Sequence, residues 1–108
     1  MTTYEFGDIV LVEFPQTGTE SPKRRPALMI LDIGDRDVVL APITTRERVA
    51  GGDAKIVNGS SAGLLREFWV RLAKVAALEK IQITRKLGWL VERDREEAAT
   101  IWNALYAL

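Results

Sequence analysis

The first strong structural signal in the chain is the segment Asp8-Ile9-Val10-Leu11-Val12-Glu13-Phe14. It is rich in β-branched and other apolar residues, and Gly7 and Pro15 bound it, so it predicts a buried β-strand. The residues between Pro15 and Pro22 are rich in Gly, Thr and Ser, which predicts a loop after this strand. The chain is therefore expected to begin as β structure.

Further strands are predicted downstream, each bounded by residues typical of turns. They lie within residues 27–31, 37–43, 55–57, 68–72 and 83–90, and residues 73–78 are expected to form a helical turn. The end of the chain differs, because Ala98, Ile101, Trp102 and Leu105 recur at i, i+3, i+4 and i+7 and so share one face of a helix. This order predicts a mainly β fold with helices, a small antiparallel barrel or curled sheet on which a C-terminal amphipathic helix packs.

Length and composition limit the class of protein. With 108 residues, of which 47% are hydrophobic, residues 1–108 are expected to form a single domain around one core. No apolar run approaches the roughly 20 residues that span a bilayer, and no secretory signal is visible, so we expect a cytoplasmic protein without a membrane partner. The absence of Cys and His excludes thiolate chemistry and His-based general bases or metal sites.

The charges are unevenly distributed although the formal net charge is zero, with 15 Lys and Arg against 15 Asp and Glu. Lys23, Arg24 and Arg25 form a basic triplet, and residues 66–86 contain six basic residues against two acidic ones. A local positive face on a neutral protein can hold phosphate groups. Lys and Arg also occur on solvent-exposed strand surfaces that bind no ligand. The charge pattern alone therefore does not decide between a phosphate-binding face and an ordinary solvated surface.

Four short segments follow one another along the chain with compatible spacing: Gly7-Asp8-Ile9-Val10-Leu11-Val12, Arg25-Pro26-Ala27-Leu28, Ala41-Pro42-Ile43-Thr44-Thr45-Arg46 and Trp69-Val70-Arg71-Leu72. Together they resemble the MazF/PemK-like toxins of type II toxin–antitoxin systems, the mRNA interferase family. The resemblance implies an SH3-like barrel of the MazF/Kid/CcdB type that forms a homodimer. It also implies a metal-independent, cofactor-free endoribonuclease that cleaves single-stranded RNA at selected sequences, and a cognate antitoxin whose disordered tail covers the RNA groove.

The resemblance also implies the site residues. The family arginine before Pro corresponds to Arg25 and the family threonine after Ala-Pro-Ile to Thr44, so these two are the expected catalytic residues. Seven further residues are expected to bind RNA: Glu20, Lys23, Arg24, Thr45, Arg46, Trp69 and Arg71.

The chain departs from the family pattern at two places. Pro22-Lys23 replaces two loop glycines, which stiffens the loop beside the expected groove. Ala73 replaces the aspartate of the Val-Arg-X-Asp tetrad found in the PemK branch, whereas Arg71 is kept. Three alternatives follow: the general base lies elsewhere, the chain relies on Arg25 and Thr44, or it cleaves poorly.

The residue types suit RNA cleavage without a metal, because the 2′-OH of RNA is an internal nucleophile beside the scissile phosphate. A guanidinium stays charged and forks onto two phosphate oxygens. We therefore expect Arg25 to stabilise the charge on phosphorus and to be a candidate for proton delivery. Thr44 would support it through a hydrogen bond to the phosphate or to the arginine.

Alternative interpretations exist for the candidates and for the function. Arg25 could be a strand-edge arginine, Thr44 a turn residue and Glu20 a solvated side chain, while Arg71 could pair with Glu67 or Glu79. Trp69 could pack in the core or in a dimer interface instead of stacking on a base. Two other functions remain open: a non-catalytic toxin of the same fold that binds DNA gyrase, and an RNA-binding protein that has lost cleavage.

Overall fold

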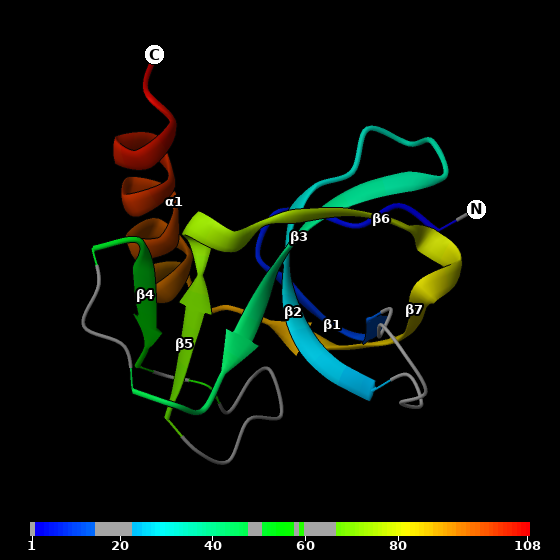
Figure 1. The fold of residues 1–108 in the computed structure, drawn as a ribbon, viewed down its shortest axis with the longest axis horizontal. Coiled ribbons are helices and arrows are strands. Elements are labelled where there is room, and N and C mark those ends of the chain that lie inside the picture. Colours follow the sequence, from blue (N-terminus) through cyan, green and yellow to red (C-terminus); the bar gives the residue numbers. More distant parts are fainter. Residues whose placement is uncertain (1, 15–22, 48–50, 58, 60–66) are drawn as a thin grey trace, which may run out of the picture.

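The computed structural model describes residues 2–14, 23–47, 51–57, 59 and 67–108. In this part of the chain, seven strands precede one C-terminal α-helix (Figure 1). The strands are β1 (Asp8–Phe14), β2 (Lys23–Leu31), β3 (Asp37–Thr44), β4 (Asp53–Ile56), β5 (Phe68–Arg71), β6 (Ala76–Glu79) and β7 (Ile83–Trp89). Two short 3₁₀ helices, η2 (Leu72–Lys74) and η3 (Lys80–Gln82), flank β6, and the helix α1 covers Glu92–Tyr106.

The strands form an antiparallel sheet in the order β4-β5-β3-β2-β1-β7, and β6 pairs with β3 outside this path. Strand β3 therefore has three partners: β2 along one edge, and β6 and then β5 along the other. Figure 1 shows α1 beside β4 and β5, with β1, β2, β3, β6 and β7 curling around the other side. The expectation of a mainly β fold with a C-terminal helix is confirmed: of the two predicted forms the structure has the curled sheet, since the described strands do not close into a barrel.

Two apolar clusters hold the sheet in this curled form, because successive side chains of a strand point to opposite faces. Strand β1 contributes Val10 and Val12 to the cluster inside the curl, together with Ala27, Met29, Val38 and Leu40. It contributes Ile9 to the second cluster, which includes Leu28, Ile43, Val70, Leu72 and Ala98. All three β1 side chains are fully buried, and burying one such aliphatic side chain contributes about 1.5–3 kcal/mol to stability.

Helix α1 packs on the second cluster through the apolar face predicted from its periodicity. Ala98 is fully buried, and Ile101 and Trp102 pack against the same cluster. Leu105 is 40% exposed, so the last position of the predicted stripe lies beyond the core. The hydroxyl of Tyr106 donates a hydrogen bond of 2.6 Å to the carbonyl oxygen of Leu72, which ties the end of the helix to η2. In the described part of the chain, no helix has the length and apolar character needed to cross a membrane.

Two boundaries differ from the sequence-based prediction. Strand β2 begins at Lys23 instead of residue 27, because β1 extends opposite it and pairs Glu13 with Arg24 and Phe14 with Lys23. The helical turn expected over residues 73–78 is wrong beyond η2, since β6 occupies Ala76–Glu79. The β6 segment pairs with β3 from Asp37 to Leu40, and this non-local pairing overrides a local sequence that favours helix.

A buried ion pair joins the segment after β2 to η3. Lys80 Nζ lies 2.9 Å from Asp32 Oδ1, and the two side chains are 9% and 0% exposed. The backbone N–H groups of Tyr4 and Gly34 donate hydrogen bonds of 2.7 and 2.8 Å to the same carboxylate. Burial raises the pKa of Asp32, but the hydrogen bonds from Tyr4, Lys80 and Gly34 outweigh it, so the pKa lies below its ordinary value.

Candidate functional site

A cleft of about 380 Å³ collects side chains from the ends of three strands. Strand β2 contributes Arg25 and β5 contributes Arg71, while β3 and the residues after it supply the centre of the lining. The described lining residues are Arg25, Pro42, Ile43, Thr44, Thr45, Arg46, Arg71 and Lys74. The cleft therefore contains Arg25 and Thr44, the two expected catalytic residues, together with three of the expected RNA-binding residues.

Strand register explains why Arg25 and Thr44 face the same space. The β2–β3 ladder ends at the pair Ala27↔Pro42. Two residues further along each strand, Arg25 and Thr44 would lie opposite each other on the face that Ala27 and Pro42 share. On its other edge, Thr44 pairs with Trp69 of β5. The strands β2 and β3 are no longer paired beyond Ala27 and Pro42, and the cleft lies there, between Arg25 and Thr44.

The hydroxyl of Thr44 accepts a hydrogen bond from the backbone and can still donate its own proton. Its Oγ1 accepts a hydrogen bond of 3.1 Å from the backbone N–H of Arg46, as in the turn interpretation of this residue. A hydroxyl can donate one proton while it accepts. Thr44 can therefore shape the turn that presents Arg46 and still donate its proton to a ligand in the cleft.

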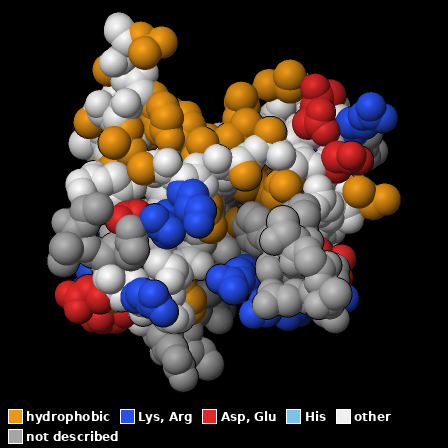
Figure 2. Space-filling model, in the orientation of Figure 1, with side chains coloured by type: hydrophobic (Ala, Val, Ile, Leu, Met, Phe, Trp, Pro, Cys, Tyr) orange, Lys and Arg blue, Asp and Glu red, His pale blue; other side chains and the backbone are white. Residues whose placement is uncertain are grey.

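The cleft is strongly cationic. Arg25, Arg46, Arg71 and Lys74 line it, and its described lining contains no carboxylate. Arg25 has no ion-pair partner within the described ranges. Figure 2 shows Lys and Arg side chains on the face over β3, β5 and the adjoining end of β2. Four cations in one concave site create a positive potential that favours a polyanion.

Arg71 has an acidic partner that the sequence did not indicate. Its Nε lies 3.9 Å from Oδ1 of Asp53, the residue paired with it across the β4–β5 ladder. The alternative interpretation of Arg71 as an ion-pair residue named Glu67 or Glu79 as the partner, but Glu67 forms an ion pair of 3.3 Å with Lys55, and Glu79 caps η3. Asp53 lies outside the strand predicted within residues 55–57, and a single sequence does not show which residue pairs with Arg71 across the two strands.

Lys23, Arg24 and Trp69, the other expected RNA-binding residues that the structure describes, do not line the cleft. Trp69 is 8% exposed in β5, and Lys55 Nζ lies 5.7 Å from its ring centroid, so the structure favours the packing role over base stacking. Arg24 lies opposite Glu13, with Nε and Oε1 3.3 Å apart. Lys23 is exposed at the start of β2. Glu20 falls outside the described residues.

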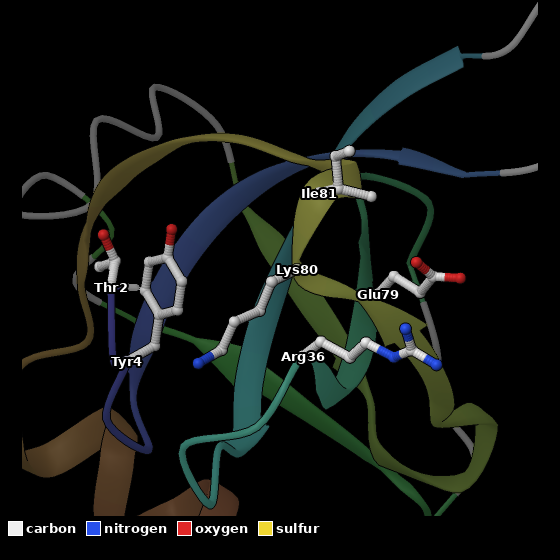
Figure 3. A pocket seen from close by; sticks show the side chains of 6 residues that line it. All are labelled: Thr2, Tyr4, Arg36, Glu79, Lys80 and Ile81. Carbon is white, nitrogen blue, oxygen red and sulfur yellow. The ribbon is translucent and has the colours of Figure 1, made fainter.

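Lys74 lines the cleft although it was not among the candidates. The available signal was its membership of the basic segment 66–86, three residues after Arg71. A second cavity of about 450 Å³ is lined by Thr2, Tyr4, Arg36, Glu79, Lys80 and Ile81 (Figure 3), and this described lining includes none of the expected site residues. Among the described residues, the expected site residues that the structure brings together are those that line the cationic cleft.

The curled antiparallel sheet, the single packed helix and the cationic cleft define a small β protein with a site suited to a polyanion. The chain belongs to the family of PemK-like, MazF-like toxins of type II toxin–antitoxin systems, whose family model matches residues 5–105. This match confirms the family predicted from the four sequence segments. No curated protein sequence matches the chain.

Solved structures of MazF proteins share the fold at low sequence identity. The Mycobacterium tuberculosis toxin MazF-mt6 is 19% identical, with a TM-score of 0.76 over 94% of this chain and 97% of that one. An endoribonuclease from a mycobacterial species, solved in complex with its cognate antitoxin, is 18% identical, with a TM-score of 0.75 over 95% and 94%. MazF in a MazE–MazF complex from Deinococcus radiodurans is 16% identical, with a TM-score of 0.76 over 99% of both chains.

Proposed function

We propose that this toxin is an endoribonuclease that cleaves single-stranded RNA in the cationic cleft, without a metal ion. The observation that carries the proposal is the convergence of Arg25, Thr44, Arg46, Arg71 and Lys74 on one cleft without a carboxylate in its described lining. The similar mycobacterial proteins described as endoribonucleases support the same activity. An mRNA substrate agrees with the expected cytoplasmic localisation.

In the proposed reaction, the 2′-hydroxyl loses its proton as its oxygen attacks the adjacent phosphorus, the bond from phosphorus to the 5′-oxygen breaks, and the leaving 5′-oxygen takes up a proton, so that no proton is gained or lost overall. The products are a 2′,3′-cyclic phosphate and a free 5′-hydroxyl. Arg25 forks onto the two non-bridging oxygens, where the negative charge grows as the fifth bond to phosphorus forms. One preorganised donor of this kind is worth about 3–4 kcal/mol in a site shielded from water.

The other lining residues hold the substrate in line for this attack. Thr44 donates its hydroxyl proton to a phosphate oxygen, while Arg46, Arg71 and Lys74 bind the phosphates on either side of the scissile one. These cations do not read the bases, because phosphate contacts position a nucleic acid without specifying its sequence. Their shared role is to align the sugar and phosphate, which lowers the entropic part of the barrier.

The proposal predicts cleavage that needs the 2′-hydroxyl and tolerates a chelator. We expect purified protein to cut a single-stranded RNA in the presence of EDTA, and to leave intact the same oligonucleotide with one 2′-deoxy sugar at the cut site. Fragment lengths on a denaturing gel measure both results. Cleavage that stops in EDTA would contradict the metal-independent mechanism. Bound but uncut RNA would favour the cleavage-deficient alternative, and inhibited gyrase with intact RNA would favour the non-catalytic toxin.

A second copy of the chain is the proposed partner for an exposed apolar groove. Leu31 and Ile33 are 53% and 74% exposed, and with Val38, Val39 and Ala77 they line a groove of about 150 Å³ that is also bordered by Asp35 and Asp37. Figure 2 shows other apolar side chains along the same upper edge of the molecule, towards α1. Exposed apolar surface of this kind marks interaction sites, and we propose a homodimer through this edge.

We expect the protein at micromolar concentration to have twice the monomer mass by light scattering coupled to gel filtration. The variant Ile33→Asp should be monomeric, because it places a charge in the apolar groove. Ile81→Asp is the matched control, since Ile81 is 86% exposed and lies outside the groove. A wild-type protein that elutes as a monomer, or an Ile33→Asp variant that stays dimeric, would count against this interface.

The second proposed partner is a cognate antitoxin. Similar MazF structures were solved with an antitoxin, in one case MazE. A cationic cleft that binds RNA phosphates also attracts a chain of carboxylates. We therefore propose that the antitoxin carries an acidic segment that covers Arg25, Arg46, Arg71 and Lys74 and so competes directly with RNA.

A further inference from the structure

Asp53 is an acidic residue that contacts the cleft residue Arg71 on the side away from the cleft. It pairs with Arg71 across the β4–β5 ladder, and its side chain is 4% exposed, whereas the side chain of Arg71 is 30% exposed and reaches the cleft. The position three residues beyond Val70 offers no acidic group, because Ala73 stands there. Of the carboxylates that form the described ion pairs, only that of Asp53 contacts a cation of the cleft lining.

The backbone holds this pair in a fixed place. The carbonyl oxygen of Gly52 accepts hydrogen bonds from the N–H groups of Leu72 and Ala73, at 3.0 and 3.3 Å. A Cβ atom on Gly52 would lie 2.8 Å from the Cβ of Ala73, so the two segments approach as closely as a glycine allows. The residue before Asp53 is thus bound to the two residues after Arg71, which limits how far either side chain can move.

The guanidinium of Arg71 has one nitrogen that faces Asp53 instead of the cleft. Its Nε is buried and makes no hydrogen bond, and it lies 3.9 Å from Asp53 Oδ1. That distance is an ion-pair contact but too long for a hydrogen bond. A guanidinium is planar, so fixing its Nε–H edge also fixes the direction of its two terminal NH₂ groups.

We propose that Asp53 is a positioning residue that orients Arg71 for RNA. When a phosphate binds to the two terminal NH₂ groups of Arg71, its Nε–H moves within hydrogen-bond distance of the Asp53 carboxylate. The guanidinium then bridges the phosphate and the carboxylate. This inference rests on the proposed ribonuclease function and assigns the orientation of one of its phosphate-binding cations. Asp53 does not touch the substrate, because it lies behind Arg71 and not among the described lining residues of the cleft.

The Asp53→Asn variant tests the proposal through kcat and KM separately. We expect kcat for RNA cleavage to fall about 10- to 100-fold, as a misplaced substrate-aligning group does. KM should stay the same or fall, because removing a negative charge beside a cationic cleft does not weaken phosphate binding. Glu67→Gln is the matched control, since it removes an exposed carboxylate, just before β5, from its ion pair with Lys55 of β4 and should leave both constants unchanged.

A double-mutant cycle separates positioning from a general structural role. If Asp53 acts through Arg71, adding Asp53→Asn to Arg71→Gln should lower kcat no further, whereas a structural effect would add to that of Arg71→Gln. Additive effects, or an Asp53→Asn enzyme with unchanged kcat, would overturn the proposal. Circular dichroism melting of each variant shows whether it is folded at the assay temperature.

A readout independent of activity distinguishes this inference from the proposed function. We expect the Nε–H proton resonance of Arg71 to lie further downfield in the wild type than in Asp53→Asn, in the free protein and with the 2′-deoxy oligonucleotide. Equal resonances in the two proteins would overturn the positioning role even if RNA is cleaved. A wild-type protein that shows the downfield resonance but leaves RNA intact would contradict the ribonuclease function and retain the Asp53–Arg71 arrangement.

Discussion

Replacing Arg25 with Ala is expected to lower the rate of RNA cleavage about 10²- to 10³-fold, the cost of removing one preorganised donor to the transition state. Arg25 is exposed at the cleft and has no ion-pair partner in the part of the chain that the structure describes. Replacing Arg25 therefore leaves no buried charge without its partner, and we expect the variant to fold. Single-turnover rates in EDTA, at saturating enzyme, measure the chemical step without the contribution of substrate binding.

The control for this experiment is another exposed strand arginine. Arg85 lies on β7 opposite Leu11 and outside the cleft, so Arg85→Ala should cleave at the wild-type rate. An Arg25→Ala protein that is folded and fully active would remove Arg25 from the proposed mechanism. In that case, Arg46, Arg71 and Lys74 are the cations left in the described lining to stabilise the charge on phosphorus.

The variant Asp32→Asn is expected to lose stability on the order of 3 kcal/mol at neutral pH, because it leaves the ammonium of Lys80 poorly solvated and without its counter-charge. The pKa of Asp32 lies below its ordinary value of 3.8 in the folded protein. A depressed carboxyl pKa contributes stability that is present above the unfolded-state pKa and is lost as the pH falls through the folded-state pKa. Wild-type stability should therefore fall below about pH 4, and the part of this fall due to Asp32 should be absent from the variant.

Urea unfolding curves at a series of pH values between 7 and 3 measure both effects. Glu96→Gln is the control: Glu96 is exposed on α1, forms none of the described ion pairs and lies outside the groove proposed for the dimer. That variant should change stability by less than about 1 kcal/mol. An Asp32→Asn protein as stable as the wild type at pH 7 would show that the buried pair contributes nothing beyond its neutral replacement.

The features predicted correctly from the sequence are those encoded by local pattern. Strand β1 follows from its β-branched run, and the buried face of α1 follows from the spacing of Ala98, Ile101 and Trp102. The order of the motif segments pointed to Arg25 and Thr44, which the fold then places in one cleft. Their chemical roles stay predictions.

The features that were missed depend on contacts between distant segments. Strand β6 has a sequence, Ala-Ala-Leu-Glu, that carries no strand signal, and it forms because β3 offers a free edge from Asp37 to Leu40. The partner of Arg71 follows from the register of β4 against β5, which a single sequence does not define. The burial of Trp69 follows from the same pairing and from Lys55 above its ring.

The three pairings of strand β3 connect the stability of the cleft to the stability of the sheet. The pairings of β3 with β2 and β6 lie along its middle, whereas Thr44 lies at its end and pairs with Trp69 of β5 in the described ladders. We therefore expect the amide protons of β3 to exchange with solvent slowly, through openings that involve much of the sheet, and those of the residues after Thr44 to exchange more readily.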